Sequence, residues 1–306
     1  MTGQRFLLTG AKGFVGTQVL QHLPRDLEVH AVSRSAVVTG NTDVTWHRAD
    51  LRDPAACRRL MADVCPDILV HCAWETEHGQ FWEAASNADW LEAGRALFSE
   101  FVSAGGTRIV ATGTCAEYVP SDGPLSETDD RGEPATRYGR AKLALLRHLE
   151  TLPVSWAWVR IFNAYGAGED ARRFVPSVAS ALAEDRIAKC SSGRQVRDFI
   201  DVRDLGRAIA QLVQLDHEGP LNIGSGDPRP LAEIARALGR IAGKPNLIGL
   251  GALPDRPGEP PVLIPDTTRQ ATLGLMPQIP LEAGLADAWR YWFQQTDEDN
   301  QEAETT

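Results

Sequence analysis

The chain has 306 residues, 43% of them hydrophobic and 24% charged, which is ordinary for a globular protein with one large domain or two unequal ones. Its formal net charge of −10 leaves no basic stripe for phosphate backbones, so neither nucleic acid nor a membrane surface is an expected partner. The five cysteines show neither CxxC nor Cys/His ligand spacing, and no run of about 18 apolar residues occurs, so we expect a reduced, cytoplasmic location without a metal.

The first half of the chain alternates short apolar strands with helical patterns, which is typical of a doubly wound parallel sheet. Strands are expected at RFLLT (5–9), LEVHAV (27–32), VTWHRAD (44–50), DILVHCA (67–73), TRIVATG (107–113) and VSWAWVRI (154–161). Helices are expected at 14–23, 54–64, 80–104 and 135–152. The fold class is therefore predicted as α/β, of the Rossmann type.

The turn after the first strand, TGAKGFVG, places glycines at Gly10, Gly13 and Gly16. Such a turn lets the backbone approach a pyrophosphate, and the helix that starts near Phe14 offers its N-terminal amides to the anion. Lys12 adds a full positive charge inside the turn. The stretch predicts a dinucleotide site.

The end of the second strand predicts which dinucleotide binds. A site specific for NAD usually has Asp or Glu there, to hold the adenosine ribose. This chain has Ser33 and Arg34, and no carboxylate lies between Glu28 and Asp43. A serine can donate to a phosphate and an arginine can hold it with its planar fork, so together with Lys12 they favour NADP over NAD.

The second half is mixed and predicts a smaller α/β domain, with helices near 175–184, 202–215 and 231–241 and an irregular Pro/Gly-rich loop at 251–265. We expect a dinucleotide-binding domain over 1–162 with return segments near 197–224, and a substrate domain largely over 163–294. The acidic residues 295–306 are expected to be disordered.

The helix at 135–152 carries Tyr138 and Lys142 four residues apart, so both face the same way, and Thr114 ends the strand IVATGT. With these residues the chain resembles the extended short-chain dehydrogenase/reductase family of nucleotide-sugar epimerases, dehydratases and reductases. TGAKGFVG is similar to TGxxGFxG, Asp50-Leu51 to the adenine contact, HCA to HxA, YGRAK to YxxxK, and RIFNAYGAG, RQVRDFIDVRDL and DRPGE to later motifs. The matches are in order and span about 80% of the chain.

The resemblance implies a role for each matching residue. Tyr138 would be the acid or base for a carbinol oxygen, Lys142 would lower its pKa and hold the nicotinamide ribose, and Thr114 would bind the same oxygen. Substrate contacts would come from Thr114, Asn163, Arg197 and Arg256, whereas Phe174 and Pro176 could face a nucleotide base or the core. Cofactor contacts would come from Gly10, Lys12, Gly13, Phe14, Val15, Gly16, Ser33, Arg34, Asp50, Leu51, His71, Cys72, Ala73, Tyr138 and Lys142.

The residues after Thr114 select among the family's reactions. A 4,6-dehydratase has an Asp-Glu pair there, but this chain has Cys115 and Ala116, and Glu117 is one place late, where an extended exit would turn it to the other side. A 3,5-epimerising reductase of this family has a cysteine two residues after the threonine. Cys115 is the first residue after Thr114, so it is not assigned that role.

Three readings stay open. The NADP-like pocket favours NADPH-dependent reduction of a nucleoside-diphosphate 4-keto-6-deoxyhexose, because a reductase exchanges its cofactor at each turnover. The alternatives are a nucleotide-sugar 4-epimerase, and a regulator that senses NADP(H) without turnover. The resemblance also implies a homodimer, paired through helices near Trp90–Ala104 and Tyr138–Leu149.

Overall fold

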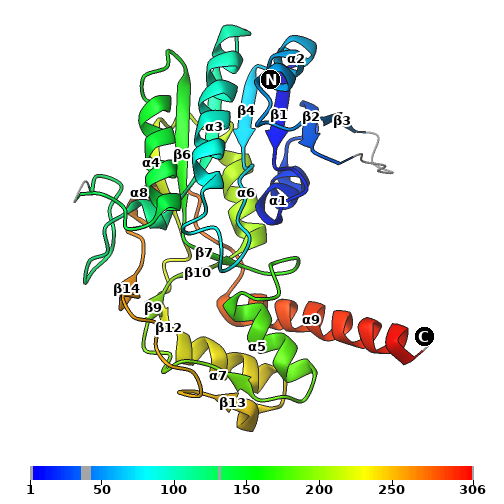
Figure 1. Cartoon of the computed structure of the whole chain (residues 1–306), viewed down its shortest axis with the longest axis vertical. Coiled ribbons are helices and arrows are strands. Elements are labelled where there is room, and N and C mark those ends of the chain that lie inside the picture. Colours follow the sequence, from blue (N-terminus) through cyan, green and yellow to red (C-terminus); the bar gives the residue numbers. More distant parts are fainter. Residues whose placement is uncertain (1–2, 36–42, 130–131, 305–306) are drawn as a thin grey trace.

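The computed structural model describes residues 3–35, 43–129 and 132–304. Seven strands form its large sheet: β1 (Arg5–Thr9), β2 (Glu28–Ser33), β3 (Val44–Arg48), β4 (Ile68–His71), β5 (Arg108–Thr114), β6 (Ser155–Ile161) and β11 (Gly219–Ile223). All neighbouring pairs are parallel, in the order β11-β6-β5-β4-β1-β2-β3 (Figure 1). The chain starts in the middle of the sheet and winds outward both ways, which confirms the predicted Rossmann-type fold class.

Helices cover both faces of this sheet. The helices α1 (Phe14–His22) and α6 (Val202–Leu212) cover one face, and α2 (Pro54–Val64), α3 (Ser86–Ser103) and α4 (Arg137–Leu149) cover the other. Strand β1 shows the cause: Phe6 and Leu8 pack with the first pair of helices, whereas Leu7 between them packs with the other three. These three side chains are fully buried, which stabilises the fold by roughly 1.5–3 kcal/mol each.

Helix α3 begins at Ser86, six residues later than the pattern predicts. Residues 78–83 form turns instead, and the Asn87 amide donates to the carbonyl oxygens of Phe81 (2.7 Å) and Ala84 (3.0 Å). An asparagine side chain that bonds nearby carbonyls competes with helix formation, which explains the late start. The turns place residues 74–85 over the carboxyl end of the sheet.

A smaller part carries short strands and three helices, below the large sheet in Figure 1. Its strand groups are β7 (Asn163–Tyr165) with β10 (Phe199–Asp201), β8 (Ala188–Lys189) with β13 (Ile248–Gly249), and β9 (Val196–Arg197) between β12 (Arg229–Pro230) and β14 (Val262–Leu263). Its helices are α5 (Phe174–Ala183), α7 (Leu231–Ile241) and α9 (Leu281–Glu304), which share one apolar core. The chain returns to the large sheet through α6 and β11, and again through α8 (Thr268–Thr272), which packs on β11.

Helix α9 continues to Glu304, into the segment 295–306 that was expected to be disordered; residues 305–306 lie outside the described residues. Leu285 and Ala288 are buried in the smaller core and anchor the first half of this helix. A helix that has started propagates cheaply through Gln, Glu and Ala, and no proline interrupts it before Glu304. No helix in the described ranges is long and apolar enough to span a membrane.

Candidate active site

A pocket of about 720 Å³ opens at the carboxyl ends of β1, β2 and β4, where doubly wound sheets bind ligands. Seven residues predicted from the sequence come together there: Gly10, Lys12, Gly13, Ser33, Arg34, Leu51 and Ala73. The lining also includes residues that sequence reasoning missed, namely Val32, Ser35, Arg48, Ala49, Trp74 and Trp90.

The glycine turn at this pocket leaves no room for side chains. Gly10 has φ +70°, and a Cβ there would lie 2.7 Å from the backbone nitrogen of Ala73. A Cβ on Gly16 would lie 2.2 Å from the Gly10 carbonyl oxygen. Gly13 precedes α1 and supplies no side-chain cap, so the first amides of the helix are available to an anion. The turn therefore fits a pyrophosphate.

Cationic and hydroxyl side chains gather at the far end of the pocket. Lys12 Nζ donates to Ser35 Oγ (3.2 Å), and Ser35 Oγ lies 3.3 Å from Ser33 Oγ. Arg48 lies opposite Ser33 in the β2–β3 register, and its Nε donates to the Arg34 carbonyl (3.2 Å). Lys12, Arg34 and Arg48 are exposed, so their charges can face a ligand. The group could hold an anionic part of a ligand. The place of Arg48 beside Ser33 could not be predicted without the register of strands β2 and β3.

Five other predicted cofactor residues, Asp50, His71, Cys72, Phe14 and Val15, do not line the pocket but lie close along the chain to residues that do. The Arg52 guanidinium binds the Asp50 carboxylate in a bidentate fashion (3.1 and 2.9 Å) and lowers its pKa. His71 Nδ1 lies 2.8 Å from Thr9 Oγ1, and burial lowers its pKa to about 3, so the ring is neutral. Burial raises the pKa of the Cys72 thiol to about 12, which keeps it protonated. Phe14, Val15 and Gly16 form the first turn of α1.

The three predicted catalytic residues also meet. Thr114 ends β5, Tyr138 lies on α4, and the Thr114 hydroxyl lies close enough to the phenol to act on its pKa. Lys142, one turn further along α4, donates from Nζ to the Thr112 carbonyl (2.8 Å) and lies 4.1 Å from the centroid of the Trp74 ring. Strand β5 and helix α4 thus place a hydroxyl, a phenol and an ammonium in one neighbourhood.

Burial is the main influence on the protonation of this group. Burial raises the pKa of the Tyr138 phenol well above its usual range, while the hydrogen bond from Thr114 opposes the shift. That Lys142 lowers this pKa stays a prediction, because in this structure the ammonium is directed at the Thr112 carbonyl and the Trp74 ring. Burial lowers the pKa of Lys142 itself to about 8. Tyr138 therefore holds its proton at neutral pH and can act as an acid.

Glu117 belongs to the support of Thr114. Residues Cys115–Glu117 form a 3₁₀ turn and not the extended exit that was expected. The fully buried Glu117 carboxylate accepts from the Thr114 amide (2.7 Å), Trp158 Nε1 (3.0 Å) and Arg160 Nε (2.8 Å). These three donors hold the carboxylate inside the protein, and the exclusion of dehydration stays a prediction. Burial also raises the pKa of the Cys115 thiol to about 11.

The predicted diphosphate contacts do not form one free cluster. Asn163 Nδ2 donates to the Asp198 carbonyl (3.1 Å). The buried Arg197 guanidinium donates to Glu259 Oε1 (3.0 Å) and to the Pro260 carbonyl (2.8 Å). Arg256 is exposed. Glu259, in the same DRPGE segment as Arg256, therefore satisfies Arg197 in place of a ligand.

Arginine side chains from two segments act electrostatically on His78. Burial lowers the pKa of His78, and the charges of Arg173, Arg256 and Arg172 lower it further, against the effect of Asp170. Arg173 precedes α5 and was not predicted; Pro176, one turn further on, is buried, and Phe174 packs against the smaller core. Arg173 and Arg256 thus both bring positive charge to this side of the site, and the charge of Arg173 also acts on the buried Glu169.

Comparison with known proteins gives a family, several relatives and solved structures that this chain resembles. The family model described as "NAD dependent epimerase/dehydratase family" matches residues 6–224. A dTDP-4-dehydro-6-deoxy-D-allose reductase from Streptomyces bikiniensis is 28% identical over 95% of this chain and 96% of the relative. A UDP-glucose 4-epimerase from Rhizobium meliloti is 26% identical over 95% and 98%. The crystal structure of a Thermus thermophilus UDP-glucose 4-epimerase with NAD superposes with a TM-score of 0.80 at 23% identity, covering 94% and 99%.

Proposed function

The chain belongs to the NAD dependent epimerase/dehydratase family, and from this premise we propose that it reduces the 4-keto group of a nucleoside-diphosphate 4-keto-6-deoxyhexose with NADPH. The observation that carries the proposal is the Thr114 hydroxyl close to the Tyr138 phenol, with Lys142 one turn further along α4, and a pocket lined by Lys12 and Arg34. The similarity to a dTDP-4-dehydro-6-deoxy-D-allose reductase supports the substrate class.

Two features favour reduction over epimerisation. The cationic end of the pocket suits NADPH, the cofactor that supplies reductive reactions and is exchanged at each turnover. In addition, the buried Tyr138 phenol keeps its proton at neutral pH. Reduction of a ketone needs an acid for the forming alkoxide, whereas epimerisation begins by removing a hydroxyl proton and needs a base.

Each residue of the site then has one task. When bound, NADPH would supply the hydride that C4 accepts. Thr114 donates its hydroxyl proton in a hydrogen bond to the keto oxygen and fixes its position, because Glu117 and the 3₁₀ turn hold Thr114 rigidly. Tyr138 transfers its proton to the same oxygen as the negative charge develops. Lys142 binds the nicotinamide ribose and favours the phenolate that remains.

The diphosphate handle of the substrate would lie between Arg173 and Arg256, whose charges meet near His78. Arg197 would join them when a phosphate replaces Glu259 as the partner of its guanidinium. Binding energy from this handle positions the ketone at Tyr138.

The test is an assay of net reduction. Purified protein, NADPH and a nucleoside-diphosphate 4-keto-6-deoxyhexose should give loss of the reduced-nicotinamide absorbance, with one NADPH consumed per sugar and the product identified by NMR. Interconversion of a nucleotide hexose with its C4 epimer, with no net change in NADPH, would establish the 4-epimerase instead, a reaction that the Rhizobium meliloti relative's name makes the second candidate. Tight NADPH binding without turnover of any keto-sugar would indicate a sensor.

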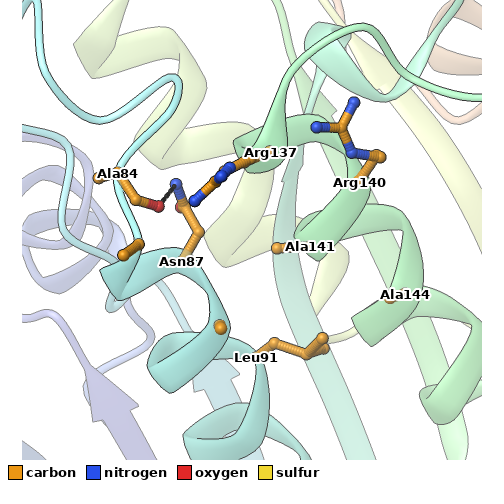
Figure 2. Close-up of a pocket in the computed structure, with 9 residues that line it drawn as sticks. Ala84, Asn87, Leu91, Arg137, Arg140, Ala141 and Ala144 are labelled. Carbon is orange, nitrogen blue, oxygen red and sulfur yellow. Dashed lines mark hydrogen bonds between the residues drawn. The ribbon is translucent and has the colours of Figure 1, made fainter.

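We also propose that the protein is a cytoplasmic homodimer paired through α3 and α4. A groove of about 300 Å³ runs between these helices, and Figure 2 shows Leu91 and Ala144 facing each other across it. Small side chains at Ala88, Ala141 and Ala144 let a second helix pair approach closely. The isologous contact would bury this groove in both copies.

A further inference from the structure

Trp74 lies between the dinucleotide pocket and Lys142. Its indole lines the pocket, whereas Lys142 is 1% exposed and is absent from the residues that line the pocket. The ammonium lies 4.1 Å from the centroid of the indole, within the range of a cation–π contact. The ring thus covers the charge on the side where a cofactor would enter.

The indole is held in this position from two sides. Its Nε1 donates to Asn87 Oδ1 (2.9 Å), and the buried Asn87 is itself fixed by the Phe81 and Ala84 carbonyls. The Trp90 ring stacks against it with centroids 6.1 Å apart. The covered state is therefore a defined conformation with its own stabilising contacts.

This position conflicts with the task of Lys142, and the inference rests on the proposed function at this point. An ammonium that binds the nicotinamide ribose must touch the ribose hydroxyls, and an ammonium behind an indole cannot. We propose that Trp74 is a movable cover that shields Lys142 in the cofactor-free protein and leaves it when the nicotinamide riboside end of NADP(H) enters. Trp74 is thus a positioning residue, which acts on the cofactor through Lys142.

The link to cofactor entry lies in the glycine turn. The place of a Gly10 side chain is 2.7 Å from the Ala73 nitrogen, so the turn that would receive the pyrophosphate abuts the backbone just before Trp74. A shift of this turn on phosphate binding would therefore be passed to Ala73, the residue before Trp74. The backbone at Ala73 therefore connects the turn that would bind the pyrophosphate with the Trp74 cover.

The first experiment needs no cofactor. The protein is treated with limiting acetic anhydride, and acetylation of each of the chain's four lysines is followed by mass spectrometry. Lys12 and Lys189 are exposed and report the dose of reagent, whereas the half-buried Lys244, which donates to the Leu182 carbonyl (2.7 Å), reports that the protein stays folded. We expect Lys142 to react at least tenfold faster in Trp74→Ala than in the unmodified protein, and to stay protected in Trp74→Phe, which keeps a ring face.

Trp82→Ala is the matched control for this experiment. Trp82 also contacts the Tyr138 ring (5.8 Å between centroids), but it does not line the pocket and is 37% exposed. Its removal should leave the protection of Lys142 unchanged. The proposal is overturned if Lys142 is acetylated equally in Trp74→Ala and in the unmodified protein. It is also overturned if Trp82→Ala raises the acetylation of Lys142 as much as Trp74→Ala does.

The second experiment measures NADP⁺ binding by calorimetry and stopped-flow fluorescence. A site that must first open binds more weakly by the fraction of open molecules, so Trp74→Ala should bind about tenfold tighter and lose a saturating opening phase. Weaker or equal binding by Trp74→Ala means that the indole is a fixed wall that contacts the cofactor, which overturns the proposal. Failure of the unmodified protein to bind NADP(H) refutes the proposed function, and the labelling result still decides whether Trp74 covers Lys142.

Discussion

Replacement of Lys142 by Met should stabilise the cofactor-free protein at neutral pH and have less effect at high pH. Burial lowers the pKa of Lys142 from 10.5 to about 8, so the folded state holds this proton less tightly than the unfolded state does. Between pH 8 and 10.5 the unfolded chain therefore binds more protons at this site, and the free energy of unfolding rises with pH across that window. The penalty of the buried charge is fully present below pH 8.

The structure sets the size of the effect. The interval from about 8 to 10.5, at roughly 1.36 kcal/mol per pH unit, corresponds to about 3 kcal/mol. Lys142→Met also removes the hydrogen bond to the Thr112 carbonyl and the contact with Trp74, which together offset about 1–3 kcal/mol. These losses are the same at every pH. The change with pH in the difference between the two free energies of unfolding therefore reports the charge of Lys142 alone.

The assay is urea unfolding followed by circular dichroism, without cofactor, at several values between pH 7 and 10.5. The free energy of unfolding of Lys142→Met minus that of the unmodified protein should fall by about 2–3 kcal/mol over this range. Lys189→Met, at an exposed lysine, is the control and should show no such trend. A difference that stays constant with pH would refute the assignment of a buried, charged Lys142.

Three further predictions concern the cofactor, the acid and the assembly. NADPH should bind at least tenfold tighter than NADH, about 1.4 kcal/mol, and Arg34→Asp, Lys12→Ala and Arg48→Ala should each reduce the ratio by calorimetry; equal affinities in the unmodified protein would contradict the assignment. Tyr138→Phe should keep cofactor affinity while turnover falls on the order of a hundredfold or more, and activity within a few-fold would mean that another group supplies the proton. Light scattering at micromolar concentration should give a dimer that Ala144→Arg dissociates, whereas a monomeric unmodified protein excludes the α3–α4 interface.

The fold could be predicted because its signals are local. The apolar alternation of RFLLT decides which face each β1 side chain covers, and Asp53 followed by Pro54 marks the start of α2 with a side-chain cap on the Ala55 amide (2.8 Å). The start of α3 was predicted too early because the competing bonds of Asn87 depend on its side-chain orientation. The helical tail was missed because composition says little about a helix that a packed segment has already nucleated.

The candidate site was predictable where a residue acts from its own turn, as Gly10 and Thr114 do. It was not predictable where the partner of a side chain comes from a segment far along the sequence. Arg197 matches a substrate motif, but Glu259, 62 residues further along, binds its guanidinium. Trp74 and Arg48 carry no motif, and their places follow from the register of neighbouring strands and the packing of α3.

The exposure of the cation cluster bears on the choice between exchange and retention of the cofactor. Lys12, Arg34 and Arg48 are solvent-exposed, so each contributes on the order of 0.2–1 kcal/mol to binding a phosphate, and salt screens that contribution. Contacts of this strength favour NADPH over NADH by about one order of magnitude and still allow fast release of NADP⁺. Fast release suits a reductase, which must release NADP⁺ after every turnover. An epimerase that recycles a bound cofactor gains nothing from easy release. Raising the ionic strength should therefore weaken NADPH more than NADH, and an NADPH preference that is insensitive to salt would assign the discrimination to the buried Ser33 hydroxyl instead.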